Sequence, residues 1–413
     1  MITFILAVRT IEKMYSIVII GGGIVGFATA LRLKESNPKL KIAVVEKEKT
    51  IASHQTGHNS GVIHSGLYYR PGSEKARNCI EGYHQLLDFC DQEEIPHEIC
   101  GKLVVATGQE QVGALDDLQK RGQQNGLTGI RRLTNQDQLK EYEPHVAGIE
   151  GLYVPQTGII DYGVVTSKYA EKFQHFGGEV FTDHTVKDIK AVKKGLKMVV
   201  TSNNVFPTRS IVICAGLQSD IISKVAGLET NYRIIPFRGE YFELKPNVQH
   251  LVKNLIYPVP DPNFPFLGVH FTRMISGGVE AGPNAVLAYR REGYRKADFH
   301  LGELLGSIGY KGFRKVMAKY WKTGIGEFYR SYSKSAFTRA LQKLIPEIRK
   351  SDLLPGHAGV RAQACDRDGG LLDDFLFVED GTILNVGNAP SPAATSSLSI
   401  GKTIAWKLLK KLG

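Results

Sequence analysis

Apolar and polar residues repeat with two different periods along this chain, and these periods predict the order of its elements. The apolar run Tyr15–Ile20 is typical of a buried strand, residues 28–34 repeat apolar positions at helical spacing, and residues 41–45 form a second apolar run. A strand, a helix and a strand in this order predict a βαβ unit with parallel strands.

The same two periods predict elements in the rest of the chain. Helical spacing recurs at 75–94, 109–125, 135–142 and 162–176, and strand-like runs occur at 102–107, 179–181, 186–191, 197–201 and 210–214. Residues 234–282 alternate apolar and polar positions between prolines, which predicts an antiparallel sheet. The chain then continues with a helical, basic region (297–343), a last strand (382–386) and a final helix (394–412). No flexible linker separates these regions, so we expect two interleaved domains.

A glycine-rich turn joins the first strand to the first helix. Gly21, Gly23 and Gly26 fit the spacing G-x-G-x-x-G, which permits a tight turn, close approach of a pyrophosphate and close helix packing. Glu46 ends the second strand, where a carboxylate accepts hydrogen bonds from ribose hydroxyls. A glycine triplet alone often forms only a turn. Together with the strand, the helix and the acid, it predicts a site for FAD or NAD, and not for NADP.

Composition and charge narrow the class of protein. The chain has 413 residues, enough for two domains, and no run is apolar for long enough to span a membrane. The apolar patch at 2–8 precedes its arginine, so we expect no signal peptide, and Met14 is a candidate start. The net charge of +11 indicates a solvated basic surface or attraction to anions, and no nucleic-acid partner is expected without a matching motif. Five cysteines without a C-x-x-C pair predict reduced thiols and no metal site.

Two further segments end in small residues, as the first strand does. The run 211–214 leads into Ala215 and Gly216, and the run 382–386 leads into Gly387. A helix follows whose first turn is expected to hold Ala394, Thr395 and Ser396. Hydroxyl caps at a helix N-terminus favour negative charge, such as that of a reduced flavin. An ordinary packing helix would show the same residues, so this favours FAD over NAD without deciding it.

Longer motifs carry a resemblance to a known family. The glycine unit and the two later strand ends together resemble the D-amino-acid oxidase-like FAD oxidoreductases. Residues 54–69, HQTGHNSGVIHSGLYY, resemble more closely the L-2-hydroxyglutarate dehydrogenases (oxidases). Shorter motifs with the same resemblance lie at 236–241, 256–260, 268–272, 282–285, 359–363 and 388–397. The resemblance extends from about Met14 to the end of the chain.

The resemblance implies both a fold and a reaction. The fold is α/β (α+β), with a Rossmann-like FAD-binding domain interleaved with an antiparallel-sheet substrate domain. The FAD-binding domain is assigned to residues 14–75, 150–230 and 350–413, the substrate domain to 76–149 and 231–349, and an N-terminal extension to 1–13. The implied reaction is oxidation of L-2-hydroxyglutarate, a small dicarboxylate, to 2-oxoglutarate, with hydride passing from Cα to flavin N5.

The reaction needs a base and a cation for the C1 carboxylate. Arg361 lies in a glycine-x-arginine strand that resembles the carboxylate-binding strand of the superfamily, unless it only pairs with Asp366 or Asp368. His270 is the expected base ahead of His64, because a sheet strand holds a side chain more rigidly than a loop. Either histidine could instead bond only to backbone in a turn.

The distal carboxylate and the rest of the cofactor need further contacts. Arg238 is the first candidate for the distal carboxylate, followed by Tyr257, Lys75 and Tyr68. Lys47 is expected to reach the adenosine of FAD. The other expected FAD contacts, mostly of backbone and small side chains, are Ser53, Thr56, Ser60, Gly61, Val62, Val186, Ala215, Gly216, Gly359, Gly387, Ala394, Thr395 and Ser396.

The sequence leaves several alternative functions open. Another flavoenzyme of this fold, acting on glycerol 3-phosphate or an amino acid, would also need a cation that binds the substrate anion. A flavin-dependent RNA-modifying protein would use the positive charge, and a nicotinamide-dependent dehydrogenase would share the glycine turn. The electron acceptor is quinone or dioxygen. The final helix, with Trp406 and several leucines and lysines, predicts a cytoplasmic protein in peripheral contact with the inner face of the membrane, unless its leucines pack inward.

Overall fold

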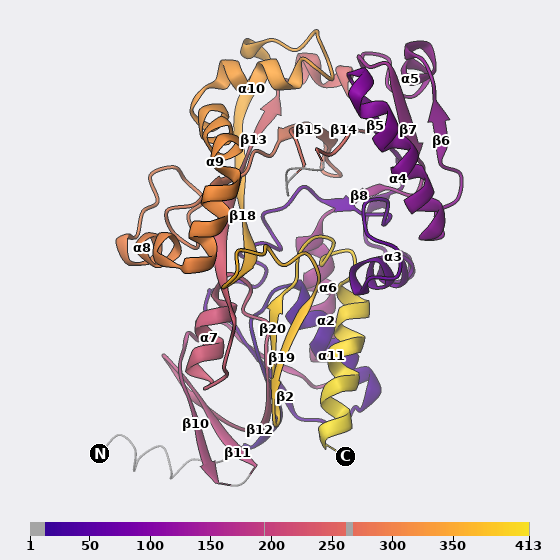
Figure 1. Ribbon diagram of the computed structural model, residues 1–413. Coiled ribbons are helices and arrows are strands. Elements are labelled where there is room, and N and C mark those ends of the chain that lie inside the picture. The colour runs from indigo at the N-terminus through magenta and orange to yellow at the C-terminus, as the bar shows by residue number, and fades with distance from the viewer. Residues whose placement is uncertain (1–12, 194, 262–266, 413) are drawn as a thin grey trace.

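The computed structural model describes residues 13–193, 195–261 and 267–412, and these form two units stacked end to end (Figure 1). The predicted N-terminal extension lies, except for Lys13, outside the described residues. The lower unit in Figure 1 contains the first strand and the last helix, whereas the upper unit is built from the middle of the chain. The chain crosses between the units several times, as the sequence predicts.

The lower unit is built around an eight-stranded sheet with a parallel centre. β1 (Tyr15–Ile20) lies between β2 (Ile42–Val45) and β12 (Val205–Ile213) and is parallel to both. The other strands are β9 (Glu179–Phe181), β10 (Val186–Lys193), β11 (Leu196–Thr201), β19 (Leu376–Asp380) and β20 (Ile383–Asn388), of which β9 and β20 extend the parallel part. Parallel strands end at one edge, so β1, β12 and β20 bring three distant parts of the sequence to the same place.

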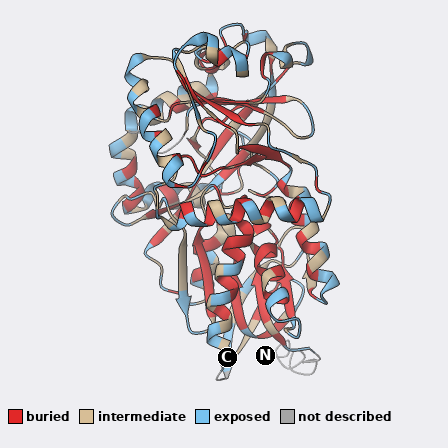
Figure 2. Cartoon of the chain, turned by 90° about the vertical axis from the view of Figure 1, so that its right-hand side faces the viewer, coloured by how far each residue is buried: buried red, intermediate tan, exposed pale blue. Residues whose placement is uncertain are grey.

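Both faces of this sheet are covered, which explains its continuous apolar strands. Side chains alternate between the faces: Ile17 and Ile19 pack with one cluster, and Val18 and Ile20 with another. The first cluster lies under α2 (Ile24–Ser36), α3 (Glu74–Gln92), α6 (Tyr162–His175) and α11 (Ser397–Leu412). The second includes residues of β10, β11 and α7 (Ser219–Val225). Figure 2 shows these strands buried and the outer sides of the helices exposed.

The upper unit is built around a nine-stranded sheet that is antiparallel except where β5 and β14 meet. Its longest pair is β13 (Tyr232–Leu244) with β18 (Leu353–Asp366). The other strands are β5 (Lys102–Ala106), β6 (Arg131–Leu133), β7 (Glu150–Val154), β14 (Leu255–Pro258), β15 (His270–Arg273), β16 (Val279–Gly282) and β17 (Val286–Leu287). A small sheet of β3 (Val62–Ile63), β4 (His97–Glu98) and β8 (Gly158–Ile160) adjoins it.

The helices of the upper unit lie at its edges. They are α4 (Val112–Gln124), α5 (Gln136–Tyr142), α8 (Leu301–Gly309), α9 (Lys311–Tyr332) and α10 (Lys334–Leu341). The region predicted as helical and basic, 297–343, holds three helices, and α9 itself bends at Tyr320. Short 3₁₀ turns occur at Gln109–Gln111, Gly216–Gln218, Pro246–Leu251 and Lys350–Asp352.

The predicted fold class is confirmed, with three corrections to its details. β18 pairs with β13 in the upper sheet, although residues 350–413 were assigned whole to the FAD-binding domain. Helix α3 packs in the core of the lower unit, although its residues were assigned to the substrate domain. The last helix begins at Ser397 rather than at residue 394, because residues 391–396 form a turn in which Ser396 donates its backbone N–H to the Pro392 carbonyl.

Candidate active site

A cavity of about 1000 Å³ lies between the two units. It is lined at one end by the glycine turn after β1 and at the other by residues of β13, β14, β15 and β18. Its volume is at the upper end of the usual range for small-molecule sites, about 300–1000 Å³. The site thus has room for a long ligand that reaches from one unit to the other.

The glycine turn is packed so tightly that side chains do not fit. Gly21 has φ +113°, and a Cβ there would lie 2.3 Å from the Cys214 carbonyl oxygen of β12's end. A Cβ on Gly26 would lie 2.0 Å from the Gly21 carbonyl oxygen, so this glycine brings α2 close to the turn. Gly21 and Gly23 line the cavity and Gly26 does not, which matches the different tasks of the three positions.

The N-terminus of α2 opens into the same part of the cavity. Gly23 is its N-cap and supplies no side-chain acceptor, and no acidic residue lies in the first turn. Thr56 Oγ1 accepts the Ile24 N–H at 3.0 Å and lines the cavity. Open N–H groups and the positive end of the helix dipole favour a phosphate at this position.

Glu46 lies at the edge of the cavity with both carboxylate oxygens oriented by backbone. Oε2 accepts the Gly22 N–H at 2.7 Å and Oε1 accepts the Glu48 N–H at 2.9 Å. Each oxygen keeps a second lone pair, so the carboxylate can still accept hydrogen bonds from ribose hydroxyls. The sequence pattern therefore corresponds to a carboxylate held in place beside the glycine turn.

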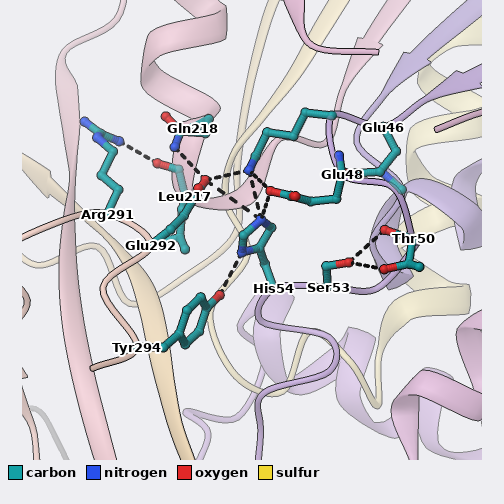
Figure 3. A network of polar contacts seen from close by, with 12 residues as sticks. Glu46, Glu48, Thr50, Ser53, His54, Leu217, Gln218, Arg291, Glu292 and Tyr294 are labelled. Atoms are coloured by element: carbon teal, nitrogen blue, oxygen red, sulfur yellow. Dashed lines mark hydrogen bonds and ion pairs between the residues drawn. The ribbon is translucent and has the colours of Figure 1, made fainter. Parts of the chain in front are cut away.

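A loop of the upper unit, residues 290–295, contacts the lower unit beside this end of the cavity (Figure 3). His54 Nδ1 lies 2.8 Å from the hydroxyl of Tyr294, whose ring stacks against His54 and, at 4.3 Å, against His58. Three residues before Tyr294, Arg291 forms a buried bidentate pair with Asp220 of α7, with hydrogen bonds of 2.6 and 2.8 Å. These contacts hold the loop of residues 290–295 against the lower unit.

Lys47 lies within this network rather than pointing freely toward an adenosine. Its ammonium pairs with Glu48 and, at 3.0 Å, with Glu292, and lies 2.9 Å from His54 Nε2. Although burial opposes it, hydrogen bonding to the two carboxylates raises the pKa of Lys47. Glu48, His54 and Glu292 have the spacing of metal ligands, but the Lys47 ammonium already pairs with both carboxylates.

The residues before α11 face the middle of the cavity. Ala394 and Thr395 line it, and Thr395 Oγ1 accepts the His64 N–H at 3.1 Å and bonds to the Tyr162 hydroxyl at 2.7 Å. Thr395 thus links the C-terminal turn to the loop after β3. Ser396 does not line the cavity; it is fully buried below the turn.

His270 lies on β15 at the other end of the cavity, stacked on the Tyr257 ring at 3.9 Å. Its Nδ1 lies 3.0 Å from the Gly268 carbonyl oxygen, which can only accept, so Nδ1 carries the proton and Nε2 keeps a lone pair. Burial lowers the pKa of His270 to about 3, helped by the positive charges of Arg361 and Lys102. The imidazole is therefore neutral at neutral pH and able to accept a proton.

His64 lines the cavity opposite, in the loop after β3. Burial, together with Lys102, lowers its pKa to about 3. Its Nε2 lies 3.2 Å from the Ser391 hydroxyl, a group that can donate or accept. The structure thus brings the two candidate bases into one cavity and fixes the tautomer of His270 but not that of His64.

Arg361 lies on β18, its side chain is exposed, and it lines the cavity. Its neighbour Gly359 has no side chain, and a Cβ there would lie 2.5 Å from the His58 carbonyl oxygen. The two aspartates considered as alternative partners have other tasks. Asp366 accepts the N–H groups of Asp368 and Gly370, and Asp368 pairs with Lys315.

Arg238 is not placed to bind substrate, contrary to the sequence prediction. Alternate residues of a strand face opposite sides, and Gly239 and Tyr241 are the residues of β13 that line the cavity next to it. Arg238 is 2% exposed, donates to Glu240 at 2.9 Å and to the Arg295 carbonyl at 3.2 Å, and does not line the cavity.

Most other predicted residues do line the cavity. They are Glu46, Lys47, Ser53, Thr56, Ser60, Val62, Val186, Ala215, Gly216, Gly359, Gly387, Tyr257, Lys75 and Tyr68. Lys75 is already paired with Asp373 at 2.7 Å. Gly61 does not line the cavity; its φ is +63°, and a Cβ would lie 2.6 Å from the Ile160 carbonyl oxygen.

Three residues of this region were missed from the sequence. Gln55 lines the cavity and its Oε1 accepts the Ala362 N–H of β18 at 2.9 Å, and Tyr241 is a buried phenol whose pKa is raised to about 12 by burial. Gln55 and Tyr241 both lie within motifs that carried the family resemblance. The motifs therefore indicated that both residues are near the site, but not which contacts they make. Lys102 begins an apolar strand and had no such signal.

Comparison with known proteins assigns the class. The sequence profile of the FAD dependent oxidoreductase family matches residues 16–406. The chain belongs to this family, and the glycine cradle, the open helix N-terminus and the fixed carboxylate of Glu46 fit FAD. The predicted cofactor is thereby confirmed.

Similar full-length proteins narrow the class further. L-2-hydroxyglutarate dehydrogenase of Indibacter alkaliphilus (strain CCUG 57479 / KCTC 22604 / LW1) is 58% identical, over 96% of this chain and 99% of that protein. The enzymes of that name from Escherichia coli (strain K12) and human mitochondria are 46% and 47% identical, over 96% and 95% of this chain and 93% and 88% of theirs. Within the family, the chain belongs to the L-2-hydroxyglutarate dehydrogenases, as the motifs predicted.

Solved structures support the fold. L-alpha-glycerophosphate oxidase from Mycoplasma pneumoniae with FAD bound has a TM-score of 0.78 and 22% identity, covering 96% of this chain and 95% of that one. Glycine oxidase from Geobacillus kaustophilus has a TM-score of 0.73 and 16% identity over the same shares. These identities are too low to carry a substrate across.

Glu46→Ala is expected to weaken FAD binding without changing substrate preference, because Glu46 lies at the glycine-turn end of the cavity. Loss of a hydrogen bond to a charged group costs about 1.5–3 kcal/mol, roughly 10- to 150-fold in the dissociation constant. Titrating apoprotein with FAD measures it. Glu379→Ala, which removes a carboxylate paired with Lys407 and Lys411 outside the cavity lining, is the matched control. Unchanged FAD affinity in Glu46→Ala would contradict the assignment.

Proposed function

We propose that this protein oxidises L-2-hydroxyglutarate to 2-oxoglutarate. The observation that carries the proposal is one cavity in which the FAD cradle continues into a pocket lined by His270, His64 and Arg361. When bound, FAD supplies the hydride acceptor for this chemistry, and the chain supplies orientation and proton transfer.

His270 takes the proton of the substrate hydroxyl. Its Nε2 is the free acceptor because the Gly268 carbonyl holds the proton at Nδ1, and stacking on Tyr257 fixes the plane of the ring. The low pKa keeps it unprotonated before substrate binds, and proton transfer to the base accompanies loss of hydride from Cα. His64, whose Nε2 contacts Ser391, is assigned to the opposite side of the pocket.

Arg361 binds the C1 carboxylate. A guanidinium donates two parallel hydrogen bonds to a carboxylate, which fixes the orientation of Cα as well as its position. Arg361 lies opposite Phe237 in the middle of the β13–β18 ladder, so paired backbone on both sides of it holds its position. Orientation of this kind lowers the barrier by holding the reacting groups in place before reaction.

Product analysis distinguishes this proposal from its alternatives. Purified holoenzyme with an artificial electron acceptor should form one 2-oxoglutarate for each L-2-hydroxyglutarate consumed. Glycerol 3-phosphate and amino acids, the substrates of other enzymes with this fold, should give rates at least about 10²-fold lower in kcat/KM, because they lack the second carboxylate or the hydroxyl. A higher kcat/KM with glycerol 3-phosphate or an amino acid than with L-2-hydroxyglutarate would mean that the enzyme acts on that class of substrate instead.

The electron acceptor and its location are also proposals. We infer that electrons pass to a quinone rather than to dioxygen, in a cytoplasmic protein that contacts the inner face of the membrane. No helix within the described ranges is long and apolar enough to cross a bilayer, so such contact would be peripheral. The human relative is named as mitochondrial.

The final helix offers less lipid-facing surface than its sequence suggested. Trp406 is 62% exposed, with Lys410 over its ring, but Leu408 is fully buried. Lys407 and Lys411 both pair with Glu379. Inward packing of the leucines, the alternative considered from the sequence, therefore describes most of this helix.

A better candidate surface lies on α8 and α9, on a different flank of the molecule (Figure 1). Its large exposed apolar side chains are Phe299, Leu301, Leu305, Ile308, Trp321, Ile325, Tyr329 and Tyr332. Its exposed cations are Lys311, Arg314, Lys315, Lys319 and Lys322, whereas Glu303 is half-buried and Glu327 buried. A surface on which apolar and basic residues outnumber acids such as Asp368, which pairs with Lys315, suits an anionic lipid surface, where each cation adds about 1 kcal/mol.

The double variant Trp321→Ala, Ile325→Glu is expected to weaken sedimentation with anionic vesicles at low salt by at least about tenfold, because it removes two exposed apolar contacts. Trp406→Ala on α11 is the matched control and should bind as wild type does. Loss of vesicle binding only in Trp406→Ala would mean that the final helix, not α8 and α9, contacts the membrane. A wild-type protein that stays in the supernatant would contradict membrane contact altogether.

A further inference from the structure

Lys102, the first residue of β5, places a buried ammonium group beside the substrate end of the cavity. The residue is 1% exposed, and Nζ lies 4.3 Å from the centroid of the Tyr68 ring and 5.0 Å from that of Tyr257. Both tyrosines line the cavity, whereas Lys102 does not; its ammonium lies against the faces of their rings. Within the part of the chain that the structure describes, Nζ forms no ion pair and no hydrogen bond.

This isolation is unusual among the buried cations of the protein. Arg291 pairs with Asp220, Arg238 pairs with Glu240, and Lys34 donates to the Pro38 carbonyl. An unpaired buried charge is costly, and contact with aromatic faces offsets only part of that cost. Burial accordingly lowers the pKa of Lys102 to about 7, with the Cys79 thiol as its opposing influence. An anion beside Nζ would remove the cost and restore the charge.

Lys102 and Arg361 both lie near the two histidines of the substrate pocket. The charges of Lys102 and Arg361 both depress the pKa values of His64 and His270, so two cations act on the same pair of histidines from separate strands. The substrate carries its hydroxyl next to one carboxylate and has a second carboxylate at the far end of its chain. With Arg361 on the first, the second needs another cation. Arg238 does not line the cavity. Of the other cations that do, Lys75 pairs with Asp373 and Arg121 donates to the Tyr68 carbonyl.

Tyr68 adds an independent sign that a ligand is bound here. Its hydroxyl is buried and has no hydrogen-bond partner among the described residues. Buried polar atoms are almost always paired. The unpaired hydroxyl of a residue that lines the cavity is therefore suited to donate a hydrogen bond to a ligand. The ring that carries it lies directly against the Lys102 ammonium.

We propose that the Tyr68 hydroxyl donates to the distal carboxylate of the substrate and that the Lys102 ammonium, held against the Tyr68 ring, supplies the opposite charge. Together they select dicarboxylic 2-hydroxy acids over monocarboxylic ones. Lys102 is then a specificity-determining residue that acts on binding of the far end of the substrate, not on the reacting atoms. The inference rests on the proposed function, because it identifies the ligand of Lys102 as part of the same substrate.

The test compares two substrates in the holoenzyme. L-2-hydroxyglutarate carries the distal carboxylate, and L-2-hydroxyvalerate has a methyl group in its place. Lys102→Met should lower kcat/KM for the dicarboxylate on the order of 10²-fold, mainly through KM, and leave that for the monocarboxylate within about threefold. Lys34→Met removes another buried lysine, outside the cavity lining, and should leave the ratio of the two substrates as in wild type.

Each other outcome has a distinct meaning. Equal loss on both substrates with a normal flavin spectrum would overturn the inference, since a structural lysine or a base would affect both alike. If Lys102→Met does not accumulate as holoenzyme, Lys102→Gln, which keeps a polar end without the charge, gives the same comparison and is judged by the same ratio. If wild type does not turn over L-2-hydroxyglutarate at all, the proposed function fails before the lysine is tested.

Discussion

His270→Ala should bind FAD normally and reduce it about 10²–10⁴-fold more slowly with L-2-hydroxyglutarate, because the substrate hydroxyl loses its proton acceptor. The structure gives this residue a fixed tautomer, with Nδ1 on the Gly268 carbonyl and Nε2 available, and a neutral ring at neutral pH. The measurement is the rate of flavin bleaching after anaerobic mixing with saturating substrate. The visible spectrum before mixing shows whether the cofactor is still bound normally.

The matched control is His97→Ala. His97 also places Nδ1 on a carbonyl two residues earlier in the chain, at 2.9 Å from Ile95 O, but it does not line the cavity. It should bleach at the wild-type rate. If His64→Ala shows the large loss and His270→Ala does not, the roles of the two histidines are exchanged.

The pH profile of kcat/KM checks the same assignment without a mutation. Burial lowers the pKa of His270 to about 3, below its usual 6.5, so the neutral form that acts as base persists as pH falls through 6.5. As the pH falls from about 8 to 5.5, kcat/KM should therefore not decline, since it reports the free enzyme, and it should rise near pH 7 as Lys102 gains its proton. A decline centred near pH 6.5 would mean that the base is a solvated histidine elsewhere.

Arg361→Lys is the second change with a large expected effect, a loss on the order of 10²-fold or more in kcat/KM. Lysine keeps the charge but donates from a single point, so the carboxylate is still attracted while Cα is no longer held in one orientation. We expect KM to rise and kcat to fall together. Arg367→Lys, an exposed residue just beyond β18, is the matched control and should change neither. Kinetics of Arg361→Lys within threefold of wild type would remove Arg361 from the site.

The sequence predicted the parts of the fold that follow from local pattern. β1 has the predicted bounds, and the glycine turn, α2 and Glu46 take the predicted arrangement, because each is determined by residues within one short segment. The predicted helical region 297–343 divides into three because single residues with extended backbone, Tyr310 (φ −72°, ψ 123°) and Ser333 (φ −113°, ψ 96°), interrupt it. Periodicity does not report such interruptions.

The substrate end was harder to predict because its residues converge only in three dimensions. Arg238 was chosen from its motif, but motif membership does not reveal the phase of a strand, and the neighbouring Gly239 and Tyr241 are the ones that line the cavity. Lys102 lies far in sequence from Tyr68 and Tyr257, and only their packing shows an ammonium without a counter-ion. Lys47 was expected to reach the adenosine of FAD, but its ammonium pairs with Glu292 of the other unit.

The most direct test of the account is anaerobic mixing of the purified holoenzyme with each enantiomer of 2-hydroxyglutarate. Arg361 on the C1 carboxylate and His270 beside the hydroxyl leave one orientation in which Cα–H faces the flavin, so handedness should decide the reaction. We expect complete bleaching of the oxidised flavin by the L-enantiomer, with stoichiometric 2-oxoglutarate, and no bleaching by the D-enantiomer. Equal bleaching by both, or by neither, would contradict the account.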